Sequence, residues 1–265
     1  MNIYKHLINI FSRPKSLEKA ARRAGYVNDQ LGIKQRYLRE SNNWESHLNN
    51  TKQFIIDAAQ KSLSKSSIAI LGSGWLHDVP IDELSQMFNS VHLIDIVHPE
   101  PIVARVQKMT NVYLQTADLT IGAVQQAANA KTFDSFCNAL NNQEINTNFD
   151  KYDMVVSVNL LNQLDIILCD FLAEKFKVSE EVLKPIRKTI QQRHLNYLPQ
   201  GKSCLITDYL QIDTSPDQST KTEKKLIYCD LPKSLFSKEW NWLFDTKQRY
   251  SVKNNTTFKV IALCF

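Results

Sequence analysis

Two glycines and an aspartate stand at the ends of two apolar runs, where backbone and side chain can hold a ligand. Gly72 and Gly74 directly follow the β-branched run 67–71, and Asp95 closes a second apolar run, 91–95. Glycine lets backbone N–H groups approach a ligand closely. A carboxylate after the second strand can accept hydrogen bonds from two neighbouring ribose hydroxyls. The unit therefore predicts a site for a ribose-bearing ligand, although a tight turn between buried strands would use the same glycines.

Further polar residues repeat this placement after later runs. Asp118 follows the extended run 112–116, where it can face a ligand or cap the next helix. Asn159 and Asn162 follow the apolar run 152–158 and can hydrogen-bond a ligand. For Asn162, the alternative is again a cap on the helix that follows.

Two histidines and one more aspartate complete the candidates. His77 and His98 could titrate near neutral pH and act as general bases, although a single loop histidine is more often only solvated. Asp208 ends a fifth run. We expect it at the ligand-binding edge of the sheet, with no role assigned. No cysteine or histidine spacing predicts a metal site.

The elements that position these residues alternate between strand and helix. Strands are expected at 67–71, 91–95, 112–116, 152–158 and 203–208, with helices near Pro80 and at 102–109, 121–131 and 180–197. This alternation predicts a doubly wound, mostly parallel α/β sheet. Residues 240–250 and 256–265 are predicted to pair as an antiparallel hairpin, so the sheet would have seven strands. The polar segments 134–150 and 213–225 are predicted to be irregular.

Residues 1–65 are predicted to form a helical cap in front of a sheet domain at 66–265. Short helices are expected at 3–11 and 16–23, and a stronger one from about Asn42, since Asn42 and Glu45 have capping-box spacing. An apolar stripe on this last helix must pack against the sheet: Trp44, Leu48, Ile55 and Ala59.

Composition limits the partners. The 265 residues carry a net charge of +5 and are 43% hydrophobic, enough for one large core. Residues 1–66 hold 12 Lys and Arg against 5 Asp and Glu. A basic front end favours an anionic partner, such as a phosphorylated substrate or nucleic acid. The other interpretation is a set of solvated helix faces, and no nucleic-acid-binding motif supports the first.

Cysteine usage and hydropathy bear on the compartment. The five cysteines form no C-x-x-C pair and are odd in number, as expected of buried thiols in a reducing compartment. No apolar stretch is long enough for a membrane span, and the first residues do not resemble a signal peptide. We therefore expect a cytoplasmic protein.

Residues 66–265 resemble the class I S-adenosylmethionine-dependent methyltransferases. The resemblance rests on the run 70–74, Asp95, the Asp118–Leu119 pair, Asn159 and the C-terminal hairpin, in that order. It implies a Rossmann-like domain that binds S-adenosylmethionine. The expected cofactor-binding residues are Gly72, Ser73, Gly74 and Trp75 under the methionine part, Asp95 and Ile96 at the ribose, Asp118 and Leu119 at the adenine, and Asn159 near the sulfonium.

The chain also departs from this family's pattern. Trp75 and His77 follow Gly74 where the family has its third glycine, so we expect a bulkier loop that presses on the cofactor. The segment 159–162 lacks the Pro-Pro-aromatic signature of adenine and glutamine amide methylation. The run 72–80 is similar to one in uncharacterised bacterial methyltransferase-like proteins, which supplies a fold but no substrate.

The resemblance implies methyl transfer to an unidentified acceptor, with His77, His98 and Asn162 as weak catalytic candidates. The alternative is a binding or scaffold protein that keeps the fold without the chemistry. A nicotinamide-dependent oxidoreductase is less favoured, because His77 stands where a pyrophosphate site needs its third glycine.

Overall fold

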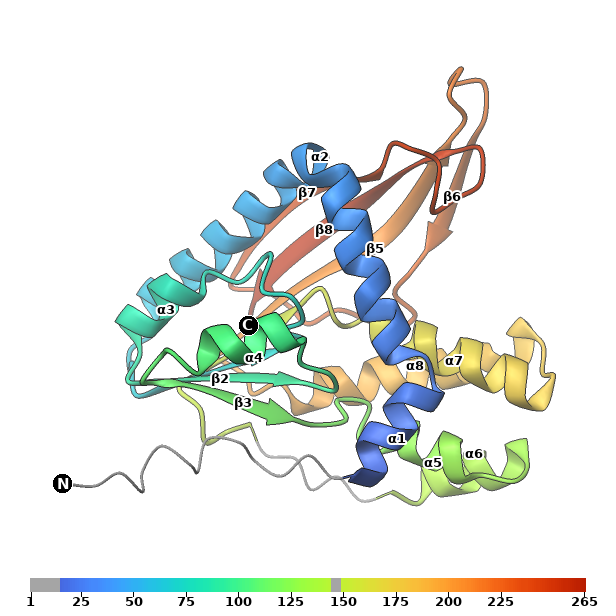
Figure 1. Ribbon diagram of the computed structural model, residues 1–265, viewed down its shortest axis with the longest axis horizontal. Helices are drawn as coiled ribbons and strands as arrows, with labels where there is room; N and C mark the ends of the chain where they lie inside the picture. The colour runs from blue at the N-terminus through green and yellow to red at the C-terminus, as the bar shows by residue number, and fades with distance from the viewer. Residues whose placement is uncertain (1–14, 144–148) are drawn as a thin grey trace.

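Eight strands form one sheet in the computed structural model, which describes residues 15–143 and 149–265 (Figure 1). The strands are β1 (Ser67–Leu71), β2 (Ser90–Asp95), β3 (Val112–Thr116), β4 (Met154–Val158), β5 (Ser203–Thr214), β6 (Lys221–Lys225), β7 (Phe236–Asp245) and β8 (Asn255–Cys264). The helices are α1 (Lys15–Arg23), α2 (Tyr26–Lys61), α3 (Ile81–Met87), α4 (Glu100–Val106), α5 (Ala123–Asn129), α6 (Phe133–Asn141), α7 (Gln163–Phe176) and α8 (Glu180–Tyr197).

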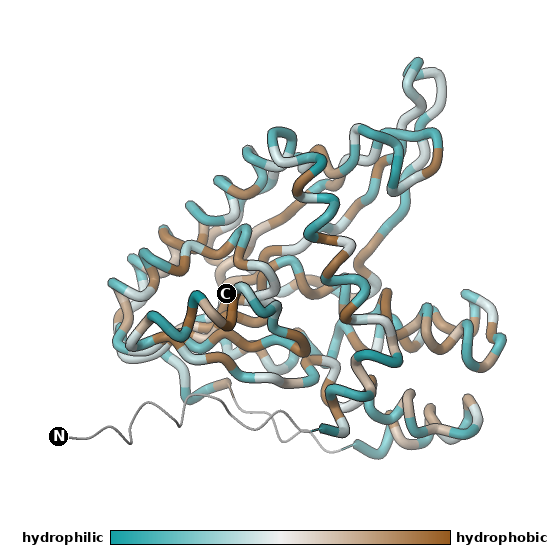
Figure 2. The backbone as a smooth tube through the Cα atoms, in the orientation of Figure 1, coloured by the Kyte–Doolittle hydropathy of each residue, from teal (hydrophilic) through white to brown (hydrophobic). Residues whose placement is uncertain are grey.

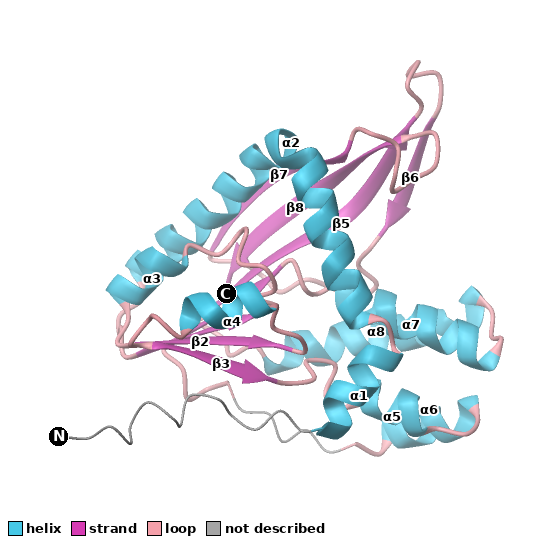
Figure 3. Cartoon of the chain, in the orientation of Figure 1, coloured by secondary structure: helices cyan, strands magenta, loops and turns pink. Residues whose placement is uncertain are grey.

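The strand order is β3-β2-β1-β4-β5-β8-β7, with β6 pairing along β5. Strands β1 to β5 are parallel, whereas β8 runs antiparallel to both β5 and β7 (Figure 3). The chain winds outward from β1 to β3 and then crosses back to β4, so the winding changes direction between β1 and β4. Ligands of open α/β sheets bind at the carboxyl ends of strands at such a point. The predicted doubly wound sheet with a C-terminal hairpin is confirmed, with eight strands instead of seven.

Helices cover both faces of the sheet. Successive residues of β1 alternate between the faces, so Ile68 and Ile70 join one core while Ala69 and Leu71 join the other. Helices α2, α3 and α4 pack on the first face, and α5 to α8 pack on the second. Hydrophobic colour follows the central strands in Figure 2. Burial on both faces explains why these strands are continuous apolar runs in the sequence.

Helix α2 begins at Tyr26, so the predicted start near Asn42 was wrong. Gly25, at φ +94°, separates α1 from α2. The predicted stripe is nevertheless buried, with Trp44 and Ile55 among its members. Residues 26–41 gave no such stripe because this part of α2 packs on little of the hydrophobic core.

Two segments predicted to be irregular contain regular structure. Helix α6 lies in the segment 134–150, and β6 lies in the segment 213–225. All five residues of β6 are exposed on an edge strand, so no apolar alternation marks it. The expected short helix at 3–11 lies outside the described residues.

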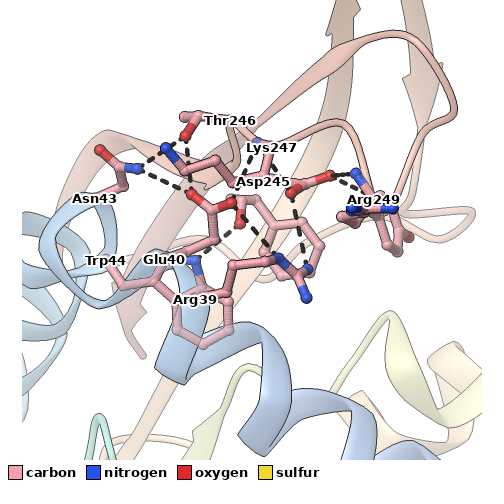
Figure 4. Close-up of polar contacts among 10 residues, drawn as sticks. Arg39, Glu40, Asn43, Trp44, Asp245, Thr246, Lys247 and Arg249 are labelled. Carbon is pink, nitrogen blue, oxygen red and sulfur yellow. Dashed lines mark hydrogen bonds and ion pairs between the residues drawn. The ribbon is translucent and has the colours of Figure 1, made fainter.

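A buried polar cluster fixes α2 to the turn between β7 and β8. In Figure 1, α2 rises from α1 to a bend and then descends toward α3. Glu40 accepts hydrogen bonds from Asn43 Nδ2 and Thr246 Oγ1, both at 2.9 Å, and from the Lys247 amide at 3.2 Å (Figure 4). Asp245, also buried, accepts from the amide of Arg249 at 2.6 Å. The cluster positions the first arm of α2, residues 26–41, relative to the sheet; the rest of the helix is its second arm.

No described helix has the length and apolar character that crossing a membrane requires.

Candidate functional site

A cavity of about 380 Å³ lies where the winding of the sheet changes direction. Its wall contains the turn after β1, the ends of β2, β4 and β5, and the first arm of α2. Of the twelve predicted site residues, eleven line it: Gly72, Ser73, Gly74, Trp75, His77, Asp95, Ile96, Asp118, Leu119, Asn159 and Asn162. His98 is not brought to the cavity; its Nε2 lies 3.0 Å from the Gln115 carbonyl oxygen.

The glycine turn packs tightly against the end of β4. Gly72 has φ +81°, and a Cβ added there would lie 2.9 Å from Leu160 Cβ and 3.0 Å from the Val158 carbonyl oxygen. Both contacts are too close for any residue with a side chain, and the positive φ also favours glycine. The turn therefore brings its backbone to the cavity wall at a place where only glycine fits.

Asp95 joins this turn to the end of β2. Its Oδ2 accepts a hydrogen bond from the Gly74 amide at 2.8 Å, and its Oδ1 accepts one from the Ile96 amide at 2.7 Å. Burial raises the pKa of Asp95, while His98 and these N–H groups oppose the rise. Oδ1 also accepts from the Val97 amide at 3.4 Å, so Oδ2 is the oxygen that keeps a further lone pair for a ligand. The ribose-binding role of Asp95 stays a prediction.

Asp118 makes the contacts of a helix cap. It accepts hydrogen bonds from the Thr120 amide at 2.9 Å and from the Val124 amide of α5 at 3.2 Å. Burial raises the pKa of this carboxyl group, and its hydrogen bonds with Thr120 oppose the rise. Asp118 also lines the cavity beside Leu119, so capping and ligand contact are compatible.

Trp75 belongs to the cavity wall and is tied to α2. Its indole N–H donates to the Gln30 carbonyl oxygen at 2.7 Å. His77 stacks on Tyr37 with ring centroids 3.8 Å apart. Burial, followed by the charge of Lys52, lowers the pKa of His77 to about 4, so the ring is neutral at pH 7.

A polar chain that the sequence did not predict runs into the cavity from α2. His47 is 1% exposed and stacks on Trp242 at 3.9 Å. The Trp240 indole N–H donates to His47 Nδ1 at 3.0 Å, so the neutral ring carries its proton on Nε2. Asn159 Nδ2, which lies 3.2 Å from Nε2, is also a donor, so this contact is not a hydrogen bond. Burial lowers the pKa of His47 to about 3. The residue is therefore a neutral, buried part of the cavity wall.

Asp78 holds the same asparagine from the other side. It accepts a hydrogen bond from Asn159 Nδ2 at 2.6 Å, and burial raises its pKa. The sequence offered one signal for each missed residue. Asp78 belongs to the run 72–80, and His47 is a polar residue between the buried Trp44 and Leu48.

Asp208 and Asn162 form a second polar pair at the end of β5. Asn162 Nδ2 donates to Asp208 Oδ2 at 2.7 Å, so the amide is not used as a side-chain cap on α7. Asp208 is 3% exposed, and its Oδ1 has no hydrogen-bond partner among the described residues. Burial raises the pKa of Asp208 to about 6, and the bond from Asn162 opposes the rise.

Several buried polar atoms in the wall have no partner in the described part of the chain: Ser73 Oγ, Asn159 Oδ1, Asn162 Oδ1 and Asp208 Oδ1. Buried polar groups are normally hydrogen-bonded, so these atoms fit a polar ligand. No described group of three or more His, Cys, Asp or Glu side chains is placed to hold a metal ion.

No family model and no curated protein matches the chain. Among solved structures it is similar to the YcgJ protein of Bacillus subtilis, at 8% identity and a TM-score of 0.40, over 82% of this chain and 98% of that one. It is also similar to a DhpI complex with SAM and HEP, at 9% identity and a TM-score of 0.37, over 89% of this chain and 97% of that one. A third similar structure is phosphoethanolamine N-methyltransferase 1 of Haemonchus contortus with phosphoethanolamine and S-adenosylhomocysteine. Its identity is 12% and its TM-score 0.34, over 89% of this chain and 49% of that one.

Likenesses of this size carry no conclusion about function, so the fold assignment rests on the strand order. In this sheet an antiparallel strand, β8, is inserted between β5 and β7. The chain has the Rossmann-like fold of the class I methyltransferases. The expected methyltransferase fold is thereby confirmed at the level of architecture.

Proposed function

We propose that the chain is a methyltransferase that uses S-adenosylmethionine. The observation that carries the proposal is the contact between Gly74 N and Asp95 Oδ2 at 2.8 Å, which joins the glycine turn and the strand-end acid in one cavity wall. Asp118 and Asn159 line the same cavity in the order that the resemblance implies. The unpartnered polar atoms of the wall also fit a polar cofactor.

Several residues would hold the cofactor. The glycine turn would lie under its amino-acid part, Asp95 would accept from the ribose hydroxyls, and Asp118 and Leu119 would meet the adenine. When bound, S-adenosylmethionine supplies a methyl group on a sulfonium sulfur, which is already activated. The protein then mainly aligns the acceptor, and alignment can lower a barrier by roughly 7–11 kcal/mol in favourable cases. Asp78, which accepts a hydrogen bond from Asn159 Nδ2, would orient Asn159 for this task.

The scaffold alternative would be favoured by an indole filling the cavity. Trp75 instead donates its N–H to Gln30 and forms part of the wall. No other observation favours a protein without catalysis.

Calorimetry with S-adenosylhomocysteine tests the proposal. We expect binding by the wild-type protein and a loss of roughly 10- to 100-fold in Asp95→Asn, because a charge-assisted hydrogen bond to the ribose is lost. Asp134→Asn, an exposed aspartate in the first turn of α6, is the control and should bind as the wild type does.

An analogue without both ribose hydroxyls separates ligand contact from support of the turn. Wild type and Asp95→Asn should bind this analogue almost equally. If the variant loses the same affinity for both ligands, Asp95 acts only through the glycine turn. Absence of binding to the wild-type protein at millimolar ligand would end the methyltransferase proposal.

A further inference from the structure

An aromatic wall forms the part of the cavity that the cofactor-binding prediction does not use. We define this wall as Trp242, Phe244, Tyr250 and Phe258, all of which line the cavity. Phe244 is its centre, with ring centroids 4.8 Å from Trp242, 4.4 Å from Phe258 and 4.9 Å from Tyr250. These rings come from β7, β8 and the turn between them, which Glu40 fixes to α2. A rigid aromatic surface of this kind suits the carbon framework of a small molecule.

Asp208 adds a charged group with one free oxygen near this wall. A bulge interrupts the pairing of β5 with β8 between Asp208 and Leu210, immediately after the aspartate. Bulges beside active sites commonly re-aim side chains. Asp208 and Tyr250 line the same cavity. Burial, followed by the charge of Asp208, raises the pKa of Tyr250. Asp208 Oδ1 is thus a buried acceptor that lacks a donor from the described residues.

The charges around the cavity favour a cationic ligand. Among the described residues that line the cavity, six are aspartates, one is an arginine (Arg36) and none is a lysine. The aspartates are Asp29, Asp78, Asp95, Asp118, Asp170 and Asp208. The Arg36 guanidinium lies over the rings of Phe244 and Tyr250, at 4.7 Å and 5.1 Å. The basic N-terminal segment favoured an anionic acceptor, but the cavity presents mainly negative charge to whatever enters it.

We infer that the methyl acceptor is an organic amine whose nitrogen is held by Asp208 Oδ1 and whose carbon framework lies against the aromatic wall. The inference rests on the proposed methyl transfer. The amine binds as an ammonium ion and passes one proton to Asp208, which frees the nitrogen lone pair. In this step the Asp208 carboxylate acts as the general base. That lone pair forms the new N–C bond while the S–C bond breaks with its electron pair kept by sulfur. The methylated product is again an ammonium ion, and the proton on Asp208 passes to solvent.

Calorimetry with three probes that share one ring tests the amine assignment. The probes are phenethylamine, phenylethanol and phenylpropanoate, titrated into wild-type protein with and without saturating S-adenosylhomocysteine. We expect phenethylamine to bind at least roughly 10-fold more tightly than the other two, because only the protonated amine can form an ion pair with the Asp208 carboxylate. Equal or tighter binding of the alcohol or the acid overturns the inference, as does failure of the amine to bind at millimolar concentration.

A pair of variants then assigns the amine to one carboxylate. Asp208→Asn keeps the shape of the side chain, and we expect it to lose roughly 10- to 100-fold of the phenethylamine affinity while keeping its affinity for S-adenosylhomocysteine. Asp170→Asn removes an exposed lining carboxylate and should change amine binding much less. Equal losses in the two variants would show that the overall negative field, and not Asp208, recognises the amine.

The two proposals fail separately. If S-adenosylhomocysteine does not bind but phenethylamine still depends on Asp208, the methyltransferase proposal fails and the amine site stands. If S-adenosylhomocysteine binds while the amine shows no preference, only the acceptor class is wrong.

Discussion

At the scale of single residues, Asp208 combines an ionised side chain at neutral pH with a buried, unpartnered oxygen. Burial raises the pKa of this carboxyl from its ordinary value of 3.8 to about 6. In the pH window between these two pKa values the folded protein binds more protons than the unfolded chain, so the free energy of unfolding falls as the pH rises from the lower value to the higher one. A shift of this size corresponds to at most roughly 3 kcal/mol of unfolding free energy at neutral pH.

Asp208→Asn should therefore be more stable than the wild type above about pH 6 and equally stable below about pH 4, the two ends of the window. The largest gain should be roughly 3 kcal/mol, because the variant no longer buries a charge. Urea unfolding of both proteins at several pH values measures the difference. A gain that persists unchanged at acid pH would show that charge is not its cause.

The sequence predicted the site residues that follow strands, and it missed those whose role depends on distant partners. Asp95 and Asp118 could be placed because an acid after a buried run stands at the ligand edge of a parallel sheet. The free oxygen of Asp208 could not be predicted, since it depends on how Asn162 is oriented. His47 acquires its role only where α2 meets Trp240 of β7.

At the scale of elements, the strands were predictable because burial on both faces leaves continuous apolar runs. The first arm of α2 and strand β6 were not, because neither packs an apolar face on a core. The start of α2 was placed at Asn42 from a capping spacing that the helix does not use. Helix α2 continues through Asn42, because Glu40, Asn43 and the β7–β8 turn bind one another there.

Removing the centre of that cluster should destabilise the protein. In Glu40→Ala, Thr246 Oγ1 and the Lys247 amide lose a buried acceptor, so we expect a loss of roughly 2–4 kcal/mol in urea unfolding. Hydrogen exchange of the Lys247 amide should also become faster. Glu45→Ala, on the exposed side of the same helix, is the matched control and should change stability by less than roughly 0.5 kcal/mol. Equal effects in the two variants would place the fixing contact elsewhere.

At the scale of the whole molecule, the N-terminal helices and the sheet share contacts on both sides of the cavity. Ala20 and Ala21 of α1 pack with Val124 and Ala128 of α5, and the second arm of α2 packs on the sheet. Arg23 donates to the Ala128 carbonyl oxygen at 3.1 Å. The described part of the predicted cap, residues 15–65, therefore lines the cavity and packs on the core, so we predict that the cap and the sheet domain unfold as one cooperative unit.

A ligand in this cavity should stabilise that unit as a whole. At 100 times its Kd, S-adenosylhomocysteine should add about 2.7 kcal/mol to the free energy of unfolding. For a chain of this size, that corresponds to a rise in Tm of roughly 5–10 °C. Calorimetry should show one transition that moves with ligand concentration, because cap residues such as Gln30 and sheet residues such as Asp95 line the same cavity. Two transitions, with only one shifted by the ligand, would mean that the cap unfolds on its own and takes no part in binding.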